Sequence, residues 1–455
     1  MSLYAAEPAG DYRKQALDMF RQVIAMKTEV GAGQVPVMAH YLADQFLSAG
    51  FAQEDVRVVP LGETASLVVR YRGRSSNLKP ILAMAHMDVV TANPADWRRD
   101  PFALTEENGY FYGRGTLDIK SGVISITSAF LRLKALNYIP DRDLIAVFTG
   151  DEETSQKTAI DLVQNHRDLI DAEFALNSDA GGGRLAEEDA HPVVYGLQTA
   201  EKTYATFELT IRNPGGHSSE PRPDNAIYQL ADALKKLQAY RFPVMWTDTT
   251  REYFRATGQR TPGRLGQAMR AFAANPLDAN ADETLNANYA YVGITRTTCI
   301  PTLLRAGHAD NALPQTATAS VNCRIFPGVS ASAVQATLQR VVGPTVEIKL
   351  PVPVIESLPS ALRNDVVETV TRTVHKLYPG VPVVPSQDSG ASDGAVFRAA
   401  GIPTYGTCQT FMKDSDDFAH GLDERLPQKS FYDGLDFWYL LLRGFGSPET
   451  YEPEH

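Results

Sequence analysis

Short apolar runs of strand length, each followed by a turn and a helical pattern, fill the first 200 residues of this 455-residue chain. The segments "KPILAMAHMDVV", "DLIAVFTG" and "EFALNSDAG" are apolar enough for strands that are covered on both faces. Helical patterns such as "SGVISITSAFLRLKALN" and "TAIDLVQNHRDLI" follow two of the strand segments. This alternation predicts an α/β fold with a mixed, largely parallel sheet.

A different pattern begins near residue 199. In "TYATFELTIRN" apolar and polar residues alternate, which is typical of a sheet covered on one face only. A second alternating strand, "ATASVNCRIFPG", and two helical patterns follow, and residues 240–300 elaborate the same part. The sequence therefore predicts an α/β domain in two parts, 1–198 and 354–455, interrupted by an inserted α+β domain over 199–353.

Charge and apolar content limit the partners of the chain. Forty-three Lys and Arg stand against 54 Asp and Glu, a net charge of -11 with no basic run, which argues against nucleic acid and anionic membranes as partners. No run of apolar residues is long enough for a membrane span. Cys299, Cys323 and Cys408 are widely spaced and odd in number, so we predict core cysteines without a disulfide or a thiolate zinc site.

The first residues, "MSLYAAEPAGDYRK", contain no complete signal peptide. The small residues of "AAEP" directly after "MSLY" are the kind of end that remains when an export signal is removed and a new start is added. The sequence therefore favours a periplasmic or secreted protein whose signal has been removed. A cytoplasmic protein is the alternative.

Acidic and histidine side chains follow the predicted strands. His86 and Asp88 stand two apart at the end of one strand, so they project from the same face, as a metal ligand and its orienting carboxylate would. Asp179 ends another strand, and Asp118 lies between glycine turns before a helix. Each has an ordinary alternative, a core histidine or a helix N-cap for example. Together they point to the carboxyl edge of the sheet, where open α/β sheets bind ligands.

The segment "GDEETS" places Asp151, Glu152 and Glu153 side by side after an apolar strand, and "FAHGLDERLP" adds His420. Two imidazoles with about three carboxylates and no thiolate suit two zinc ions that share a bridging carboxylate, with cobalt or manganese as substitutes. Such a pair activates water, and a free carboxylate beside it carries the proton. One glutamate would bind metal, its neighbour would stay off it, and Asp151 would close the turn.

Six motifs occur in the order and spacing of a known family: "MAHMDVV", "GRGTLDIKSG", "GDEETS", "NSDAGG", "GGHSS" and "AHGLDERL". From about residue 10 to residue 445 the chain resembles the dizinc peptidases that include glutamate carboxypeptidase, carboxypeptidase S and the aminoacylases. Its insert, with "GHADNALPQTATASVNCRIFPG", looks closest to the carboxypeptidase S and N-acyl-amino-acid hydrolase branch. The resemblance implies a catalytic α/β domain and a lid domain of the dimerisation type.

The resemblance also implies two zinc sites that share one carboxylate. His86, Asp118 and Asp179 would bind the first ion, and Asp118, Glu153 and His420 the second. Asp118 would be the bridge, and the peptide bond after it is commonly cis in this family.

The remaining catalytic roles are implied in the same way. Glu152 would be the general base and acid, and Asp88 would orient His86. In the lid, His217 is similar to a histidine that polarises the scissile carbonyl, often from the partner subunit of a dimer. Whether this chain forms a homodimer stays open.

Three further residues match positions that hold the carboxylate of the substrate. Arg324 lies on the polar face of its predicted strand, from which a guanidinium can grip a carboxylate, although a solvated arginine fits the same pattern. Asn311 in "DNALP" and Gly390 in "SGASDG" match by resemblance, and "SGASDG" departs from the commoner Gly-Gly-Thr/Ser-Asp form.

We therefore predict a zinc-dependent hydrolase that cleaves an amide bond next to a free α-carboxylate, either in small peptides or in N-acyl amino acids. The sequence leaves the acyl group open. The alternative is a catalytically inactive binding protein of the same fold, which predicts a missing base or ligand. An aminopeptidase of related core would need an amine site and no inserted domain.

Overall fold

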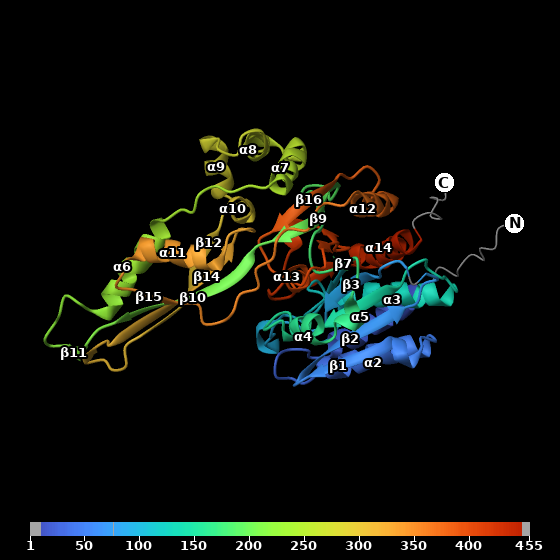
Figure 1. Ribbon diagram of the computed structural model, residues 1–455, viewed down its shortest axis with the longest axis horizontal. Coiled ribbons are helices and arrows are strands. Elements are labelled where there is room, and N and C mark those ends of the chain that lie inside the picture. The colour runs from blue at the N-terminus through green and yellow to red at the C-terminus, as the bar shows by residue number, and fades with distance from the viewer. Residues whose placement is uncertain (1–10, 76, 448–455) are drawn as a thin grey trace. The chain divides into compact units, whose positions relative to one another are not determined.

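The computed structural model describes residues 11–75 and 77–447 (Figure 1). The first ten residues, on which the export prediction rests, lie outside this description. The chain forms two compact units. The first contains the residues up to Thr199, Ser360–Ser386 and those from Ser392 onward, and the second contains Ala200–Pro359 and Gln387–Ala391. The sequence-based division has its boundaries after residues 198 and 353.

The first unit is built on a ten-stranded sheet in the order β1-β2-β6-β3-β7-β17-β9-β8-β18, with β16 also paired to β9. The strands are β1 (Val56–Leu61), β2 (Thr64–Tyr71), β6 (Leu144–Thr149), β3 (Ile81–His86), β7 (Phe174–Asn177), β17 (Thr404–Gly406), β9 (Pro192–Glu201), β8 (Gly182–Leu185), β18 (Phe411–Met412) and β16 (Val383–Asp388). Strands β6, β3, β7 and β17 run parallel, whereas β1, β2 and β9 pair antiparallel. The predicted mixed, largely parallel sheet is confirmed.

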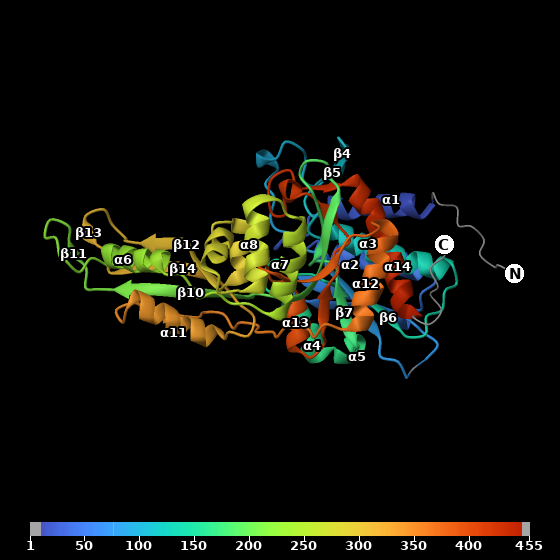
Figure 2. The same cartoon turned by 90° about the horizontal axis from the view of Figure 1, so that it is seen from above.

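Helices cover both faces of this sheet, which explains why β3 and β6 are buried at every residue. One face carries α1 (Asp11–Ala25), α2 (Val35–Ser48), α3 (Lys120–Ala135), α12 (Asn364–Leu377) and α14 (Gln428–Gly446). The other carries α4 (Lys157–Asn165), α5 (Arg167–Ile170) and α13 (Gly394–Ala399), which gather together in Figure 2. Among the helices of the described residues, none is long and apolar enough to cross a bilayer.

A small three-stranded sheet beside the main one joins distant parts of the chain. It consists of β4 (Thr105–Glu107), β5 (Tyr110–Tyr112) and β19 (Arg425–Pro427), in the order β19-β5-β4. Because β19 pairs antiparallel with β5, the chain just before β19 lies next to the chain just after β5. This pairing brings the segment around His420 to the segment around Asp118.

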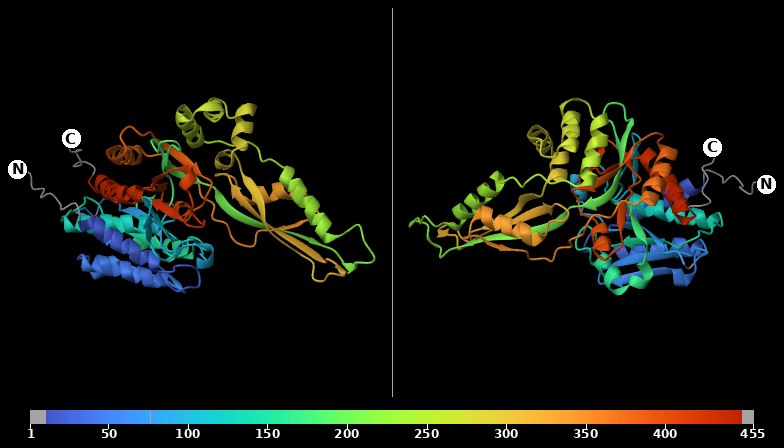
Figure 3. Two further views of the ribbon diagram at one scale, coloured as in Figure 1. Left: turned by 180° about the vertical axis from the view of Figure 1, so that it is seen from behind. Right: turned by 45° about the horizontal axis from the view of Figure 1, so that its top comes forward.

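The second unit has the predicted one-sided sheet. Its strands β12 (Thr298–Ala306), β14 (Thr316–Ile325), β10 (Thr203–Arg212) and β15 (Glu347–Lys349) pair antiparallel in that order. Helices α6 (Ala226–Ala239) and α11 (Ala331–Val342) pack on one face, as Figure 3 shows. Every second residue of β14 is buried against them, so the alternation read from the sequence is confirmed.

Four further helices follow α6 in the chain: α7 (Asp248–Arg260), α8 (Gly263–Ala274), α9 (Ala279–Asn286) and α10 (Tyr289–Val292). They build a small core of their own around Phe254, Met269 and Phe272. Residues 240–300 therefore elaborate the insert with a helical subdomain, as predicted.

One prediction about the cysteines is wrong. Cys299 and Cys323 form a disulfide between directly paired positions of β12 and β14, with the two Cα atoms 4.0 Å apart. Their separation of 24 residues carries no information about strand register, and the register alone brings the two side chains together. Cys408 is a free, half-buried thiol.

Candidate active site

Three neighbouring parallel strands bring polar side chains to one edge of the main sheet. His86 is the last residue of β3, Glu152 and Glu153 lie in the turn after β6, and Asp179 follows β7. Because β6, β3 and β7 are adjacent and parallel, their carboxyl ends meet. The convergence expected from the sequence is present in the structure.

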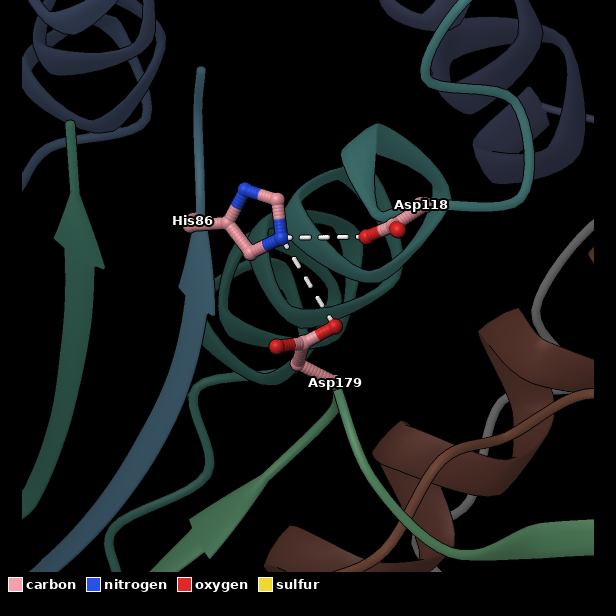
Figure 4. Close-up of side chains that lie close together, drawn as sticks. All are labelled: His86, Asp118 and Asp179. Carbon is pink, nitrogen blue, oxygen red and sulfur yellow. Dashed lines mark hydrogen bonds and ion pairs between the residues drawn. The ribbon is translucent and has the colours of Figure 1, made fainter. Parts of the chain in front are cut away.

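Asp118 completes a first group with two of these residues. The Nε2 atom of His86 lies 3.1 Å from Asp118 Oδ1 and 3.6 Å from Asp179 Oδ1, and both carboxylates face the imidazole in Figure 4. Asp118 is not a helix cap, since Ile119 holds the N-cap position of α3 and makes no side-chain cap. The Asp118–Ile119 peptide bond is cis, as the resemblance implies.

A second group forms on the other side of Asp118. The Nε2 atom of His420 lies 3.0 Å from Asp118 Oδ2 and 3.0 Å from Glu153 Oε2. The two oxygens of one carboxylate therefore face two different imidazoles. In each group the candidate ligand atoms lie within 4.8 Å of one another, and the same holds for a third group, His86 with Glu152 and Glu153.

Asp88 orients the His86 ring and the turn that carries Glu152 and Glu153. Its backbone carbonyl lies 3.0 Å from Nδ1 of His86 and its carboxylate 3.4 Å, so Nδ1–H donates there and Nε2 is left for a metal. The carboxylate of Asp88 also accepts the backbone N–H groups of Glu152, at 3.1 Å, and Glu153, at 3.0 Å. The sequence had suggested only the contact to His86.

The electrostatics of the cluster favour a bound cation. Burial raises the pKa of Asp179 to about 7 although His86 opposes this shift. Burial, and then the charge of Asp179, raise the pKa of Glu152 well above its usual value. Burial opposes ionisation of Asp118, but hydrogen bonds from His420 and His86 outweigh it and lower the pKa of Asp118. Divalent metal ions would neutralise these converging carboxylates.

The carboxylates also raise the pKa values of the two imidazoles. Hydrogen bonds to Asp118 and Glu153 raise the pKa of His420 to about 10. Burial lowers the pKa of His86, but Asp179 and its other acidic neighbours outweigh burial and leave the pKa of His86 well above the usual value. The surrounding carboxylates therefore favour a positively charged imidazole at both positions, and a bound metal ion would supply that positive charge in place of the proton. Two imidazoles with several carboxylates fit zinc, cobalt or manganese.

Asp151 takes no part in this cluster. Its carboxylate accepts hydrogen bonds from the Ser155 hydroxyl at 2.5 Å and from the backbone N–H groups of Lys157 and Thr158, both at 2.9 Å. These bonds close the turn that presents Glu152 and Glu153. The predicted turn role of Asp151 agrees with this geometry.

Asp393 is a buried acid that is not among the site residues predicted from the sequence. Its Oδ2 atom accepts the Thr149 hydroxyl at 2.5 Å, and its Oδ1 atom has no hydrogen-bond partner within the described chain. Its negative charge adds to the shift that raises the pKa of Glu152. The sequence signal was weak, because "SGASDG" carries a single acid without a histidine nearby.

The remaining predicted residues lie in the second unit. His217 is exposed on β11 (Gly216–His217), which pairs with β13 (Ala312–Leu313), and the backbone N–H of the next residue donates to Asn311 O at 3.0 Å. The structure thus brings His217 and Asn311 into neighbouring segments. Arg324 lies on β14, with its guanidinium 4.6 Å from the ring centre of Tyr204. Gly390 has open space where a side chain would begin.

The sequence is similar to known proteins over most of its length. The family described as Peptidase family M20/M25/M40 matches residues 82–444. The chain is 29% identical over 427 residues to the N-fatty-acyl-amino acid synthase/hydrolase PM20D1 of Xenopus tropicalis, covering 90% of this chain and 80% of that protein. It is 28% identical over 392 residues to the probable carboxypeptidase S-like 2 of Dictyostelium discoideum, covering 83% and 74%. The crystal structure of an M20 family metallo-carboxypeptidase from Sulfolobus solfataricus has the same fold, with a TM-score of 0.71 and 17% identity over 94% of this chain and 98% of that one.

Proposed function

Because the chain belongs to peptidase family M20/M25/M40, a family of metal-dependent hydrolases, we propose that it cleaves an amide bond next to a free α-carboxylate with the help of two zinc ions. The observation that carries this proposal is the position of Asp118, whose Oδ1 faces His86 and whose Oδ2 faces His420. A ligand shared by two metal ions must offer one oxygen to each ion. The carboxylate of Asp118 meets this requirement, because each of its oxygens faces a different imidazole.

Five residues would hold the two ions: His86, Asp118 and Asp179 for the first, and Asp118, Glu153 and His420 for the second. Paired metals supply an activated water and electrostatic stabilisation of the oxyanion that develops on the scissile carbonyl. The chain contributes the fixed ligand geometry, because Asp88 holds both the His86 ring and the backbone of Glu152 and Glu153.

Glu152 would take a proton from the attacking water and return it to the leaving amine. Burial and the surrounding acids raise its pKa, which suits a group that must both accept and release a proton near neutral pH. Its backbone is fixed by Asp88, so its carboxylate is held beside the ligands. Glu153, whose carboxylate meets His420, is assigned to the metal instead.

In the second unit, His217 would polarise the scissile carbonyl, and Arg324, Asn311 and Gly390 would bind the substrate carboxylate. The exposure of His217 and the position of Arg324 on the uncovered face of its sheet support these roles. The relatives named above support two substrate classes, peptides with a free carboxyl end and N-acyl amino acids.

A substrate panel with and without a chelator tests the proposed function. The panel contains dipeptides, N-acetyl amino acids and long-chain N-acyl amino acids, each with its C-terminal amide as the matched control. We expect hydrolysis of at least one free-carboxylate class, loss of that activity with chelator, and recovery with zinc. If the zinc-loaded protein hydrolyses no member of the panel, a binding protein of the same fold becomes the better interpretation.

We further propose that the chain forms a homodimer through the edge strand β12. This strand ends the sheet of the second unit and exposes Ile300, Leu303 and Leu304. Light scattering after gel filtration should give about twice the chain mass of 49.8 kDa. Leu304→Lys should shift the mass towards one chain, whereas Ile139→Lys, at an exposed position of the first unit, should not. A wild-type mass of one chain at micromolar concentration would rule the dimer out.

Export to an oxidising compartment is the localisation we propose. The Cys299–Cys323 disulfide supports it, since such bonds persist mainly outside the reducing cytosol. Alkylation of protein taken from its native cells, followed by intact-mass measurement, should find these two cysteines blocked and Cys408 labelled after unfolding. Three labelled cysteines in freshly isolated protein would favour the cytoplasmic alternative.

A further inference from the structure

Arg114 and Glu424 form a buried ion pair next to the two ligand groups. The guanidinium Nη1 lies 2.6 Å from Glu424 Oε2, and the side chains are 3% and 0% exposed. Arg114 precedes the shared ligand Asp118 by four residues, and Glu424 follows the ligand His420 by four residues. The pair therefore joins two ligand segments that are far apart in sequence.

Glu424 reaches from the His420 segment to the Asp118 segment. Its carboxylate accepts the backbone N–H groups of Gly115 at 3.1 Å, Leu117 at 2.7 Å and Asp118 itself at 3.0 Å. These bonds cover most of the turn that ends in the shared ligand, so the backbone of Asp118 is fixed by a residue 306 positions later in the chain.

Arg114 makes the opposite connection. Besides its ion pair with Glu424, its Nη2 donates to the backbone carbonyls of Gly421, at 3.1 Å, and His420, at 3.4 Å. Each charged residue thus lies close in sequence to one ligand and holds the backbone of the other. We call this pair of residues, Arg114 and Glu424, the clasp.

The ligands differ in how much they need such support. His86 ends a fully buried strand, and Asp179 follows a strand in the middle of the same sheet. His420 lies in a loop, with a backbone φ of 62° and a side chain that is 55% exposed. Among the five proposed ligands, His420 depends most on contacts from neighbouring segments to keep its distance from Asp118.

We propose that the clasp sets the spacing between Asp118 and His420 and thereby controls how tightly the second ion, held by Asp118, Glu153 and His420, is bound. This inference rests on the proposed two-metal function. Arg114 and Glu424 are positioning residues, since both side chains are buried and neither belongs to the ligand groups of the described residues. The first ion, at His86 and Asp179, should depend much less on the clasp.

The test measures zinc content by mass spectrometry after equilibration at graded free zinc concentrations. Arg114→Lys keeps a positive charge opposite Glu424 but loses the planar fork that also reaches the His420 carbonyl. Glu424→Gln keeps an acceptor for the backbone N–H groups but loses the charge that pairs with Arg114. We expect each variant to raise the dissociation constant of the second ion about 10- to 100-fold, with little change for the first.

Glu173→Gln is the matched control. Glu173 accepts hydrogen bonds from Arg142, at 2.6 Å, and from Arg363, at 2.5 Å, in the same unit, but it lies before β7, at the end of that strand away from Asp179. This variant also removes a charge from an arginine pair, so it measures the effect of lower stability on metal binding. We expect Glu173→Gln to keep its second ion. Thermal unfolding of the metal-free proteins measures the loss of stability in all three variants, so that their metal affinities can be compared at a known loss of stability.

Three outcomes would overturn the role of the clasp. The first is unchanged affinity for the second ion in both variants, the second is equal weakening of both ions, and the third is failure of both variants to fold, which would make the pair a general folding determinant. A wild-type protein that binds two ions yet hydrolyses nothing contradicts the proposed function alone. A wild-type protein that binds fewer than two ions contradicts both.

Discussion

Glu152→Gln is expected to lower kcat by about 10²- to 10⁴-fold while both metal ions stay bound. The amide of glutamine has nearly the shape of the carboxylate, so the contact of the residue 152 backbone with Asp88 is preserved. What is lost is the ability to take up and release a proton. Metal content by mass spectrometry and steady-state kinetics on one preparation measure both effects together.

The neighbouring residue provides the contrast for this prediction. Glu153→Gln should lose zinc from the second site, because Oε2 of Glu153 lies 3.0 Å from the His420 ring and is a proposed ligand. The two glutamates share the same turn and the same anchor on Asp88, so general damage to the turn would affect both variants alike. If Glu152→Gln loses a metal and Glu153→Gln keeps both, the two assignments must be exchanged.

The sequence predicted the parts of the molecule that follow from local pattern. Uninterrupted apolar runs predicted buried parallel strands such as β3, and strict alternation predicted the one-sided strand β14. Once strands are parallel neighbours, their carboxyl ends must meet, so the closeness of His86, Glu153 and Asp179 follows from the fold class. Local pattern thus accounts for both sheets and for most of the candidate site.

The parts that were missed depend on register and on contacts between distant segments. The disulfide exists because Cys299 pairs with Cys323 in the ladder between β12 and β14, and nothing local in the sequence sets that register. Arg114 and Glu424 belong to the motifs "GRGTLDIKSG" and "AHGLDERL", but the sequence does not show that each side chain bonds to the backbone of the other motif. Whether a charged residue is buried cannot be predicted from the sequence unless the oppositely charged residue that pairs with it is known.

Arg324→Ala should lower kcat/KM for substrates with a free α-carboxylate by between about 30-fold and several thousand-fold. The corresponding C-terminal amides should change much less. A guanidinium that grips a carboxylate with two hydrogen bonds contributes little to an uncharged amide, so the two substrate classes separate the charge contact from all other effects. Initial rates on matched acid and amide pairs measure the difference.

Two further variants decide whether the geometry of Arg324 or only its charge matters. Arg324→Lys keeps the charge without the planar fork, so it should recover part of the loss if charge alone guides the substrate and little of it if the paired hydrogen bonds are required. Arg212→Ala removes an arginine from the adjacent strand β10, where the side chain is 65% exposed and pairs with Glu347, and it should leave both substrate classes unchanged. Equal losses on acids and amides in Arg324→Ala would show that Arg324 supports the sheet through its contact with Tyr204 and does not bind the substrate. The preference for a free α-carboxylate that defines the proposed activity would then require another positively charged side chain in the second unit.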